Sequence, residues 1–257
     1  RVTVNRVWQH YFGAGLVATP DNFGRSGARP SHPELLDFLA AQFIESGWSL
    51  RAVHRLILDS TTFRQTSAPR SRGLARDPDN HLLWRYPLHR LDAEAIRDAM
   101  LAAAVRLGTK TNGPYVPTPR GGNGEVIVDE SKPDALARSI FLQHRRTQIP
   151  TFLGTFDAPS VVFNCTRRAA TTMPLQSLSQ LNSDFAVKRG QDLARRVEAD
   201  CGPGADATAR IRRAFVLSCG REPDAAERKL ALRFLDQQRL AYAGQSDIER
   251  RAWDDLW

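Results

Sequence analysis

The chain of 257 residues is poor in lysine and rich in arginine. Of its 36 basic residues only four are lysines, Lys110, Lys132, Lys188 and Lys229, and the other 32 are arginines. Alanine is also abundant, and this combination is typical of GC-rich coding. Coding bias and a solvated surface explain the formal net charge of +8. The alternative explanation is a surface that binds anions.

Cysteine is scarce, and neither cysteine nor histidine forms a cofactor motif. Cys165, Cys201 and Cys219 form no C-x-x-C pair and no C-x-x-C-H sequence, so we expect no c-type haem in this segment. Their odd number permits at most one internal disulfide, and spacing alone does not decide the pairing. The six histidines show no zinc spacing such as H-E-x-x-H, so no metal site is expected.

Long apolar runs and nucleotide-binding motifs are also missing. No run approaches the roughly 18 to 20 apolar residues of a membrane-spanning helix, so we expect no span. There is no P-loop and no dinucleotide-binding glycine fingerprint. The stretch from Arg64 to Arg90 is basic and has aromatic residues nearby, but Trp84 lies in the apolar "LLW" and is predicted to be core. Nucleic acid is therefore not expected as a partner.

What the sequence does contain is helical periodicity. Apolar residues at helical spacing predict helices over residues 1–18, after Pro33, from Leu50, after Asp92 and over most of the chain from residue 174 onward. Polar residues at the helix starts predict caps. They are Ser31 with Glu34, Ser49, Asp92, and Asp224 with Glu227.

Residues 109–137 interrupt this pattern because they are dense in glycine and proline. The short runs "EVIVD" and "ARSIFLQHRR" predict a small β element around residues 126–145. We therefore expect a mainly α, multi-helical fold in three parts: an N-terminal helical half (1–108), a Gly/Pro-rich excursion (109–137) and a C-terminal helical half (138–257). These parts are expected to form one integrated domain, truncated at both ends because the chain begins without methionine and stops at "WDDLW".

The stretch "FDAPSVVFNCTRRAATTMPLQSLSQLN", residues 156–182, concentrates polar side chains before a helix. Thr171 or Thr172 is predicted to cap a helix over about 174–199, with Pro174 in its first turn. A helix N-terminus carries unpaired N–H groups and a partial positive charge. With Arg167 and Arg168 just before it, this start predicts a site for a sulfate, phosphate or carboxylate.

Two other interpretations of this stretch remain open. In the structural one, an arginine pairs with Asp157 and fixes the loop, while Gln176 and Asn182 bond to backbone groups. In the catalytic one, Cys165 is a nucleophile whose thiolate is favoured by the arginines, with His144 or His54 as the base. Cysteine is also a common buried small residue, which is the ordinary alternative for Cys165.

Five ordered blocks carry a family resemblance: "NRVWQHYFGAGLVATPDNFG", "SHPELLDFLAAQFIESGWSLRAVHRLILDSTTFRQTS", "LDAEAIRDAM", the stretch of residues 156–182, and "RIRRAFVLSCGREPDAAE". They resemble a conserved C-terminal domain of unknown function in large planctomycete-type proteins with cytochrome c-like N-terminal regions. The resemblance implies an exported, extracytoplasmic protein in the periplasm, in the cell envelope or secreted. It further implies neighbouring domains of the same polypeptide as partners and a c-type haem in a region preceding this segment. It supplies no catalytic residues.

Two functional hypotheses follow. In the first, the chain is an accessory module that binds an anionic ligand, such as a sulfated or acidic polysaccharide, or a partner domain. Its binding residues are Arg167, Arg168, Thr171 and Thr172. In the second, it is a hydrolase or redox-linked enzyme acting on polysaccharide, with a site around residues 157–172. Asp157, Cys165 and Gln176 are the further site candidates, and the sequence does not decide whether the site is catalytic.

Overall fold

The computed structural model describes residues 1–160, 162, 165–202 and 204–256. Helices dominate this part of the chain, which confirms the mainly α prediction. The chain forms two compact units, Arg1–Arg90 and Leu91–Trp257. The division that the sequence suggested, at residues 108 and 137, remains a proposal about domain organisation. The sequence-based division places the helix of residues 93–103 in the N-terminal half, whereas this helix belongs to the second compact unit.

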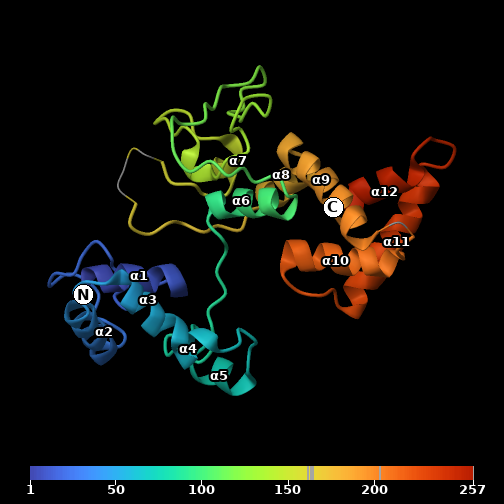
Figure 1. Ribbon diagram of the computed structural model, residues 1–257. Coiled ribbons are helices and arrows are strands. Elements are labelled where there is room, and N and C mark those ends of the chain that lie inside the picture. Colours follow the sequence, from blue (N-terminus) through green and yellow to red (C-terminus); the bar gives the residue numbers. More distant parts are fainter. Residues whose placement is uncertain (161, 163–164, 203, 257) are drawn as a thin grey trace. The chain divides into compact units, whose positions relative to one another are not determined.

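The first unit is built from short helices around an aromatic and aliphatic core (Figure 1). Trp8 and Phe12 stack with ring centroids 4.2 Å apart. Burial of such side chains supplies most of the driving force for folding. The helices are α1 (Val2–Phe12), α2 (Pro33–Glu45), α3 (Leu50–Asp59), α4 (Thr61–Arg64) and α5 (Ser71–Arg76).

Helix starts in the first unit follow the predicted capping only in part. Ser49 caps α3, since its hydroxyl accepts the N–H of Ala52 at 3.3 Å. Ser31 does not cap α2, and that prediction was wrong. Its hydroxyl instead donates to the carbonyl of Leu16 at 3.3 Å, and α2 starts one residue later than a Ser31 cap requires, at Pro33.

Helix α1 is shorter than its predicted range of residues 1–18. A buried asparagine of the helix holds the segment that follows it. Gly13 ends the helix with a φ of 75°, a left-handed conformation that glycine adopts readily. The Asn5 amide then bonds the backbone of Val17 in both directions, at 2.8 and 3.1 Å. A Cβ at Gly15 would lie 2.6 Å from the Asn5 amide nitrogen, so this close approach requires glycine.

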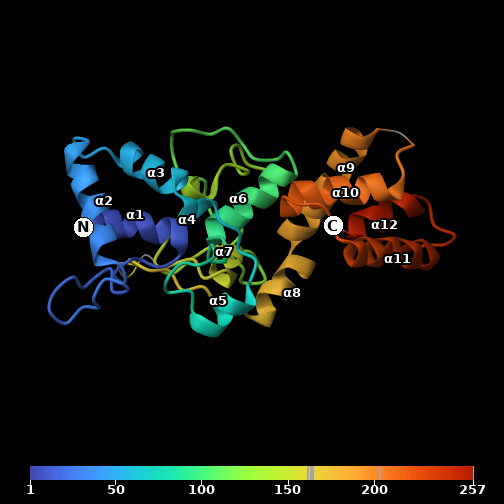
Figure 2. The same ribbon diagram turned by 90° about the horizontal axis from the view of Figure 1, so that it is seen from below.

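The second unit contains the longer helices, of which α9, α10, α11 and α12 pack together into a bundle (Figure 2). Ile211, Leu235 and Trp253 form its buried centre. The elements are α6 (Ala93–Ala103), η1 (Ser139–Phe141), α7 (Thr151–Thr155), α8 (Pro174–Asn182), α9 (Asp184–Cys201), α10 (Ala207–Cys219), α11 (Ala225–Ala241) and α12 (Ile248–Leu256).

The single long helix predicted over residues 174–199 is in fact two helices. Ser183 has extended backbone angles, with φ −72° and ψ 138°. Its hydroxyl accepts the N–H of Ala186 at 3.3 Å and so starts α9. Serine competes for backbone hydrogen bonds in this way, and the apolar pattern that continues across it does not reveal the break.

The expected β element around residues 126–145 is limited to single bridges. Val116 pairs with Leu142, Arg120 with Val126, and Arg145 with Gln148, and no strand occurs in the described part of the chain. The strand predicted over "ARSIFLQHRR" was wrong, because Ser139 starts a 3-10 turn there. The Asp98 carboxylate accepts both the backbone N–H and the hydroxyl of Ser139, at 2.8 and 2.7 Å, which removes that N–H from any ladder.

The predicted capping box of Asp224 and Glu227 is confirmed at the start of α11. The Asp224 carboxylate accepts the N–H of Glu227 at 2.8 Å, and the Glu227 carboxylate accepts the N–H of Asp224 at 2.9 Å. Arg221 adds a two-pronged contact to Glu227, at 2.6 and 2.7 Å. The Arg221 hydrogen bonds and the backbone N–H of Asp224 lower the pKa of Glu227 to about 2.

A carboxyl titration by NMR is expected to show Glu227 titrating near pH 2. Because its folded pKa is depressed, its stabilising contribution is fully present above about pH 4.5 and is lost as the pH falls towards 2. Arg221→Gln should raise the pKa of Glu227 to a value between these limits, since the bond to Asp224 remains. Arg228→Gln, an exposed change on the same helix, is the control and should leave the titration unchanged.

Candidate functional site

The polar stretch of residues 156–182 consists of a loop after α7 and of helix α8, and Asp157 and Thr171 close the loop at its base. The Asp157 carboxylate accepts the backbone N–H of Thr171 at 2.8 Å and its hydroxyl at 2.9 Å. Asp157 has a φ of 62°, a conformation uncommon for residues other than glycine. Thr171 therefore closes the loop, and the prediction that Thr171 or Thr172 caps the helix was wrong. Met173 occupies the cap position, with Pro174 in the first turn as predicted.

Gln176 stabilises the junction of this loop with α8. Its side chain is buried and donates to the carbonyl of Thr155 at 3.1 Å. Its carbonyl oxygen accepts the N–H of Met173 at 3.4 Å. Asn182, at the other end of α8, donates to the carbonyl of Leu178 at 3.1 Å. The expectation that Gln176 and Asn182 bond to backbone groups is therefore confirmed.

Arg168 connects the loop to the first turn of α6. Its guanidinium forms an ion pair with Glu94 and lies 3.7 Å from the carboxylate of Asp92, which occupies the cap position of α6 without a capping bond from its side chain. Burial lowers the pKa of Arg168, but the hydrogen bond to Glu94 and the charges of Glu94 and Asp92 together outweigh this effect and the net shift is upward. Burial raises the pKa of Glu94, yet the hydrogen bond from Arg168, a backbone hydrogen bond and the charge of Arg168 together bring it below its usual value. Two carboxylates thus largely neutralise an arginine that was predicted to bind an external anion.

The remaining candidates of the loop face solvent. Arg167, Thr172 and Cys165 are exposed, so the interpretation of Cys165 as a buried residue was wrong. The Cys165 thiol donates to the carbonyl of Arg167 at 3.3 Å and lies within electrostatic range of Arg168. The loop therefore brings Arg168 to Glu94 of α6 and leaves the Cys165 thiol exposed.

Among the described residues, the cysteines and the potential metal ligands do not come together in a metal site. Cys165, Cys201 and Cys219 are all free thiols. No group of three or more histidine, cysteine, aspartate or glutamate side chains among the described residues is placed to hold a metal ion.

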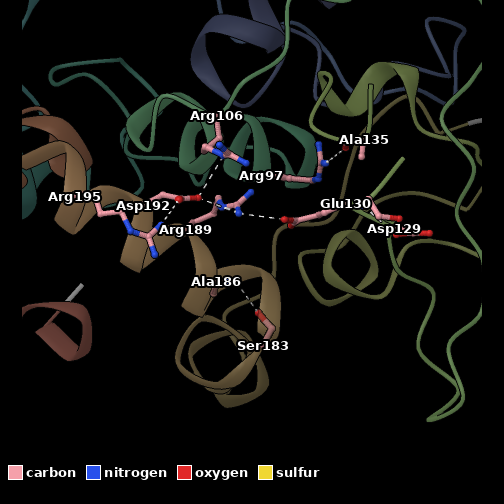
Figure 3. A network of polar contacts seen from close by, with 11 residues as sticks. Arg97, Arg106, Asp129, Glu130, Ala135, Ser183, Ala186, Arg189, Asp192 and Arg195 are labelled. Atoms are coloured by element: carbon pink, nitrogen blue, oxygen red, sulfur yellow. Dashed lines mark hydrogen bonds and ion pairs between the residues drawn. The ribbon is translucent and has the colours of Figure 1, made fainter. Parts of the chain in front are cut away.

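Two buried arginines, one from α6 and one from α9, lie between these two helices (Figure 3). The sequence analysis did not predict this pair. The first member, Arg97 of α6, is only 3% exposed. It donates to the carbonyls of Ala137 and Ala135 at 3.0 and 3.1 Å and to the Ser139 hydroxyl at 3.3 Å. Burial lowers the pKa of Arg97 and the nearby Arg189 lowers it further, while Asp98 and Glu130 act in the opposite direction.

The second member, Arg189 of α9, is 4% exposed and bridges two carboxylates. It lies 3.2 Å from Glu130 and 3.0 Å from Asp192 (Figure 3). Its Nε and Nη1 atoms are buried and have no hydrogen-bond partner among the described residues. The guanidinium lies 5.5 Å from the centre of the Phe185 ring, and that of Arg97 lies 5.4 Å from the same ring. The ring thus offsets part of the cost of burying both charges.

The sequence did hold a signal for both buried arginines. Ala93, Arg97 and Leu101 are four residues apart and occupy one face of α6, and all three are buried. On α9 the same holds for Arg189, Leu193 and Val197. An arginine at the centre of an apolar helical face predicts a buried charge that needs acceptors from elsewhere in the chain.

Comparison with known families gives one match. The model of the family described as PSD1, protein of unknown function (DUF1553), matches residues 1–235. No curated protein and no solved structure matches the chain.

Asp192 offers a direct comparison between a buried and an exposed arginine. Arg189→Met is expected to lower the free energy of unfolding by about 3–5 kcal/mol, because Glu130 is left without its buried partner. Arg195→Met removes an arginine that is 64% exposed and lies 2.9 Å from the same Asp192, and should cost about 0–1 kcal/mol. Urea denaturation of both variants measures the difference. If both variants lose the same free energy of unfolding, burial does not control the strength of these contacts.

Proposed function

Because the chain belongs to the DUF1553 family of proteins of unknown function, we propose a role from the geometry of its loop. We propose that the chain is an accessory binding module, and that its exposed loop binds an anionic ligand such as a sulfated or acidic polysaccharide. The contact residues are Arg167 and Thr172.

The observation that supports this proposal is the anchoring of the loop at two points. Asp157 bonds to Thr171 at the base, and Arg168 pairs with Glu94 on α6. The exposed Arg167 is thus presented by a segment that is held in place on both sides. Binding residues are commonly carried on loops that a rigid scaffold positions, and anchoring reduces the entropy lost when a ligand binds.

The two neighbouring arginines then have different roles. Arg167 contacts the ligand, while Arg168 is a positioning residue whose charge is already matched by Glu94 and Asp92. Thr171 is likewise a positioning residue, and Thr172 is exposed beside it. An exposed ion pair contributes only about 0–1 kcal/mol. A polymer with repeated anionic groups compensates for such a weak contact by binding several sites at once.

We further propose that the module belongs to a larger exported protein with a cytochrome c-like region. The five ordered sequence blocks described above support this context. Neighbouring domains of the same polypeptide are then its covalent partners, and any c-type haem lies in that other region. Fractionation of cells that express the full-length gene product would locate the protein.

Calorimetric titration with dextran sulfate tests the binding proposal. Arg167→Ala should weaken binding at least fivefold and leave the melting temperature unchanged, because the side chain is exposed. Arg168→Ala should weaken binding and also lower the melting temperature, because Glu94 loses its partner. Arg233→Ala, which removes an exposed arginine from α11, is the matched control and should behave as the wild type. The proposal fails if the wild type and Arg167→Ala release equal heats.

A second candidate function is a hydrolase or redox-linked enzyme acting on polysaccharide. The exposed Cys165 thiol favours it, since a nucleophile has to be accessible. In this case Cys165→Ser should abolish the release of new reducing ends from a polysaccharide. Cys219→Ser, a change at another exposed free thiol, should retain the activity. Absence of such products with the wild type, or equal activity of both variants, rules out the cysteine mechanism.

A further inference from the structure

We propose that the first unit binds to the surface of an anionic lipid bilayer through the arginines of α3, α4 and α5. These helices follow one another along the chain with short connections (Figure 1). The α3–α5 arginines are Arg51, Arg55, Arg64, Arg70, Arg72 and Arg76, and all six are exposed.

Within the part of the chain that the structure describes, none of the six forms an ion pair or a side-chain hydrogen bond. Residues 46–76 contain only one acidic residue, Asp59, so the sequence offers these arginines almost no local neutralisation. Six unpaired guanidinium groups in 31 residues create a strongly positive surface.

A comparison with the second unit shows that coding bias does not explain why the α3–α5 arginines lack acidic partners in the described part of the chain. It is as rich in arginine, yet many of its exposed arginines are paired with acids. Arg195 contacts Asp192 at 2.9 Å, and Arg221 contacts Glu227 at 2.6 Å. Biased coding supplies arginines to both units. In the first unit Arg1 pairs with Asp37, whereas the α3–α5 arginines form no ion pair among the described residues.

The helices of the first unit also keep like charges close together. Arg51 and Arg55 are four residues apart on α3, and Arg72 and Arg76 are four residues apart on α5. Like charges at this spacing repel each other and weaken a helix. An anionic surface would relieve this repulsion in both helices at once.

Exposed apolar side chains among these arginines indicate a lipid surface rather than a soluble polyanion. On α3, Leu58 lies on the same face as Arg51 and Arg55, opposite the buried Val53 and Ile57. Leucine gains nothing from a sulfated or phosphorylated polymer in water. At a bilayer surface, leucine and tryptophan enter the boundary of the acyl chains while arginine contacts the headgroups.

The ends of the same segment add larger apolar groups. Trp48, immediately before α3, is 66% exposed, and Leu82 and Leu88, after α5, are 71% and 80% exposed. No helix among the described residues has the length and apolar character needed to cross a bilayer. The combination fits a protein that lies on a membrane surface, with arginines for attraction and a few apolar groups for insertion.

Vesicle flotation tests this proposal with phosphatidylcholine vesicles that contain or lack phosphatidylglycerol. The wild type should bind only the anionic vesicles, and added salt should weaken binding. Arg51→Gln with Arg55→Gln should lower the partition coefficient about tenfold. Arg72→Gln with Arg76→Gln should act in the same direction on a separate helix. The matched control, Arg228→Gln with Arg233→Gln, removes the same charge from α11 and should leave binding unchanged.

Leucine variants separate a bilayer from other polyanions. Leu82→Ser with Leu88→Ser should weaken vesicle binding several-fold but leave binding to dextran sulfate or double-stranded DNA unchanged. Circular dichroism confirms that each variant is folded, which is expected because all the changed side chains are exposed. Equal binding to neutral vesicles, equal losses in the α3 and α11 variants, or no effect of the leucine changes would each overturn the proposal.

Discussion

The burial of two guanidinium groups is the constraint on which the second unit depends. Arg97 and Arg189 are removed from water, so the chain has to bring acceptors to them. Arg97 takes carbonyl and hydroxyl oxygens from residues 135–139, and Arg189 takes the carboxylates of Glu130 and Asp192. These contacts explain how a Gly/Pro-rich segment holds its position against α6 and α9 with only single β-bridges of its own.

The same electrostatic logic distinguishes three environments for arginine in one chain. Buried arginines such as Arg97 have their hydrogen bonds supplied by the backbone. Arginines at the edge of the core, such as Arg168, are neutralised by carboxylates and hold segments together. Exposed arginines such as Arg51 form no ion pair with any described residue and keep their charge available. The uniform arginine excess in the composition therefore hides different physical roles.

Helical periodicity predicted the fold class because it depends on local apolar spacing, and capping was predicted where the cap bonds locally, as at Ser49 and Asp224. Some failures are local, such as the break at Ser183, and the others have a common cause, which is a side chain bonded to a distant group. Ser31 bonds to Leu16, and Ser139 bonds to Asp98, 41 residues away. In the loop, the candidates Arg168 and Thr171 were likewise engaged by Glu94 and Asp157. Such pairings over long sequence separations leave no mark in a local pattern.

The contacts of Arg97 also determine the order in which the second unit can form during synthesis. Its carbonyl acceptors, Ala137 and Ala135, lie 40 and 38 residues further along the chain, at the end of the excursion of residues 109–137. Until those residues leave the ribosome, α6 cannot bury its charged face without a large desolvation penalty. The nascent helix therefore stays hydrated and undocked until the excursion closes. We expect the closure of that loop to be slower than the formation of α6 itself, because contacts over long sequence separations form slowly.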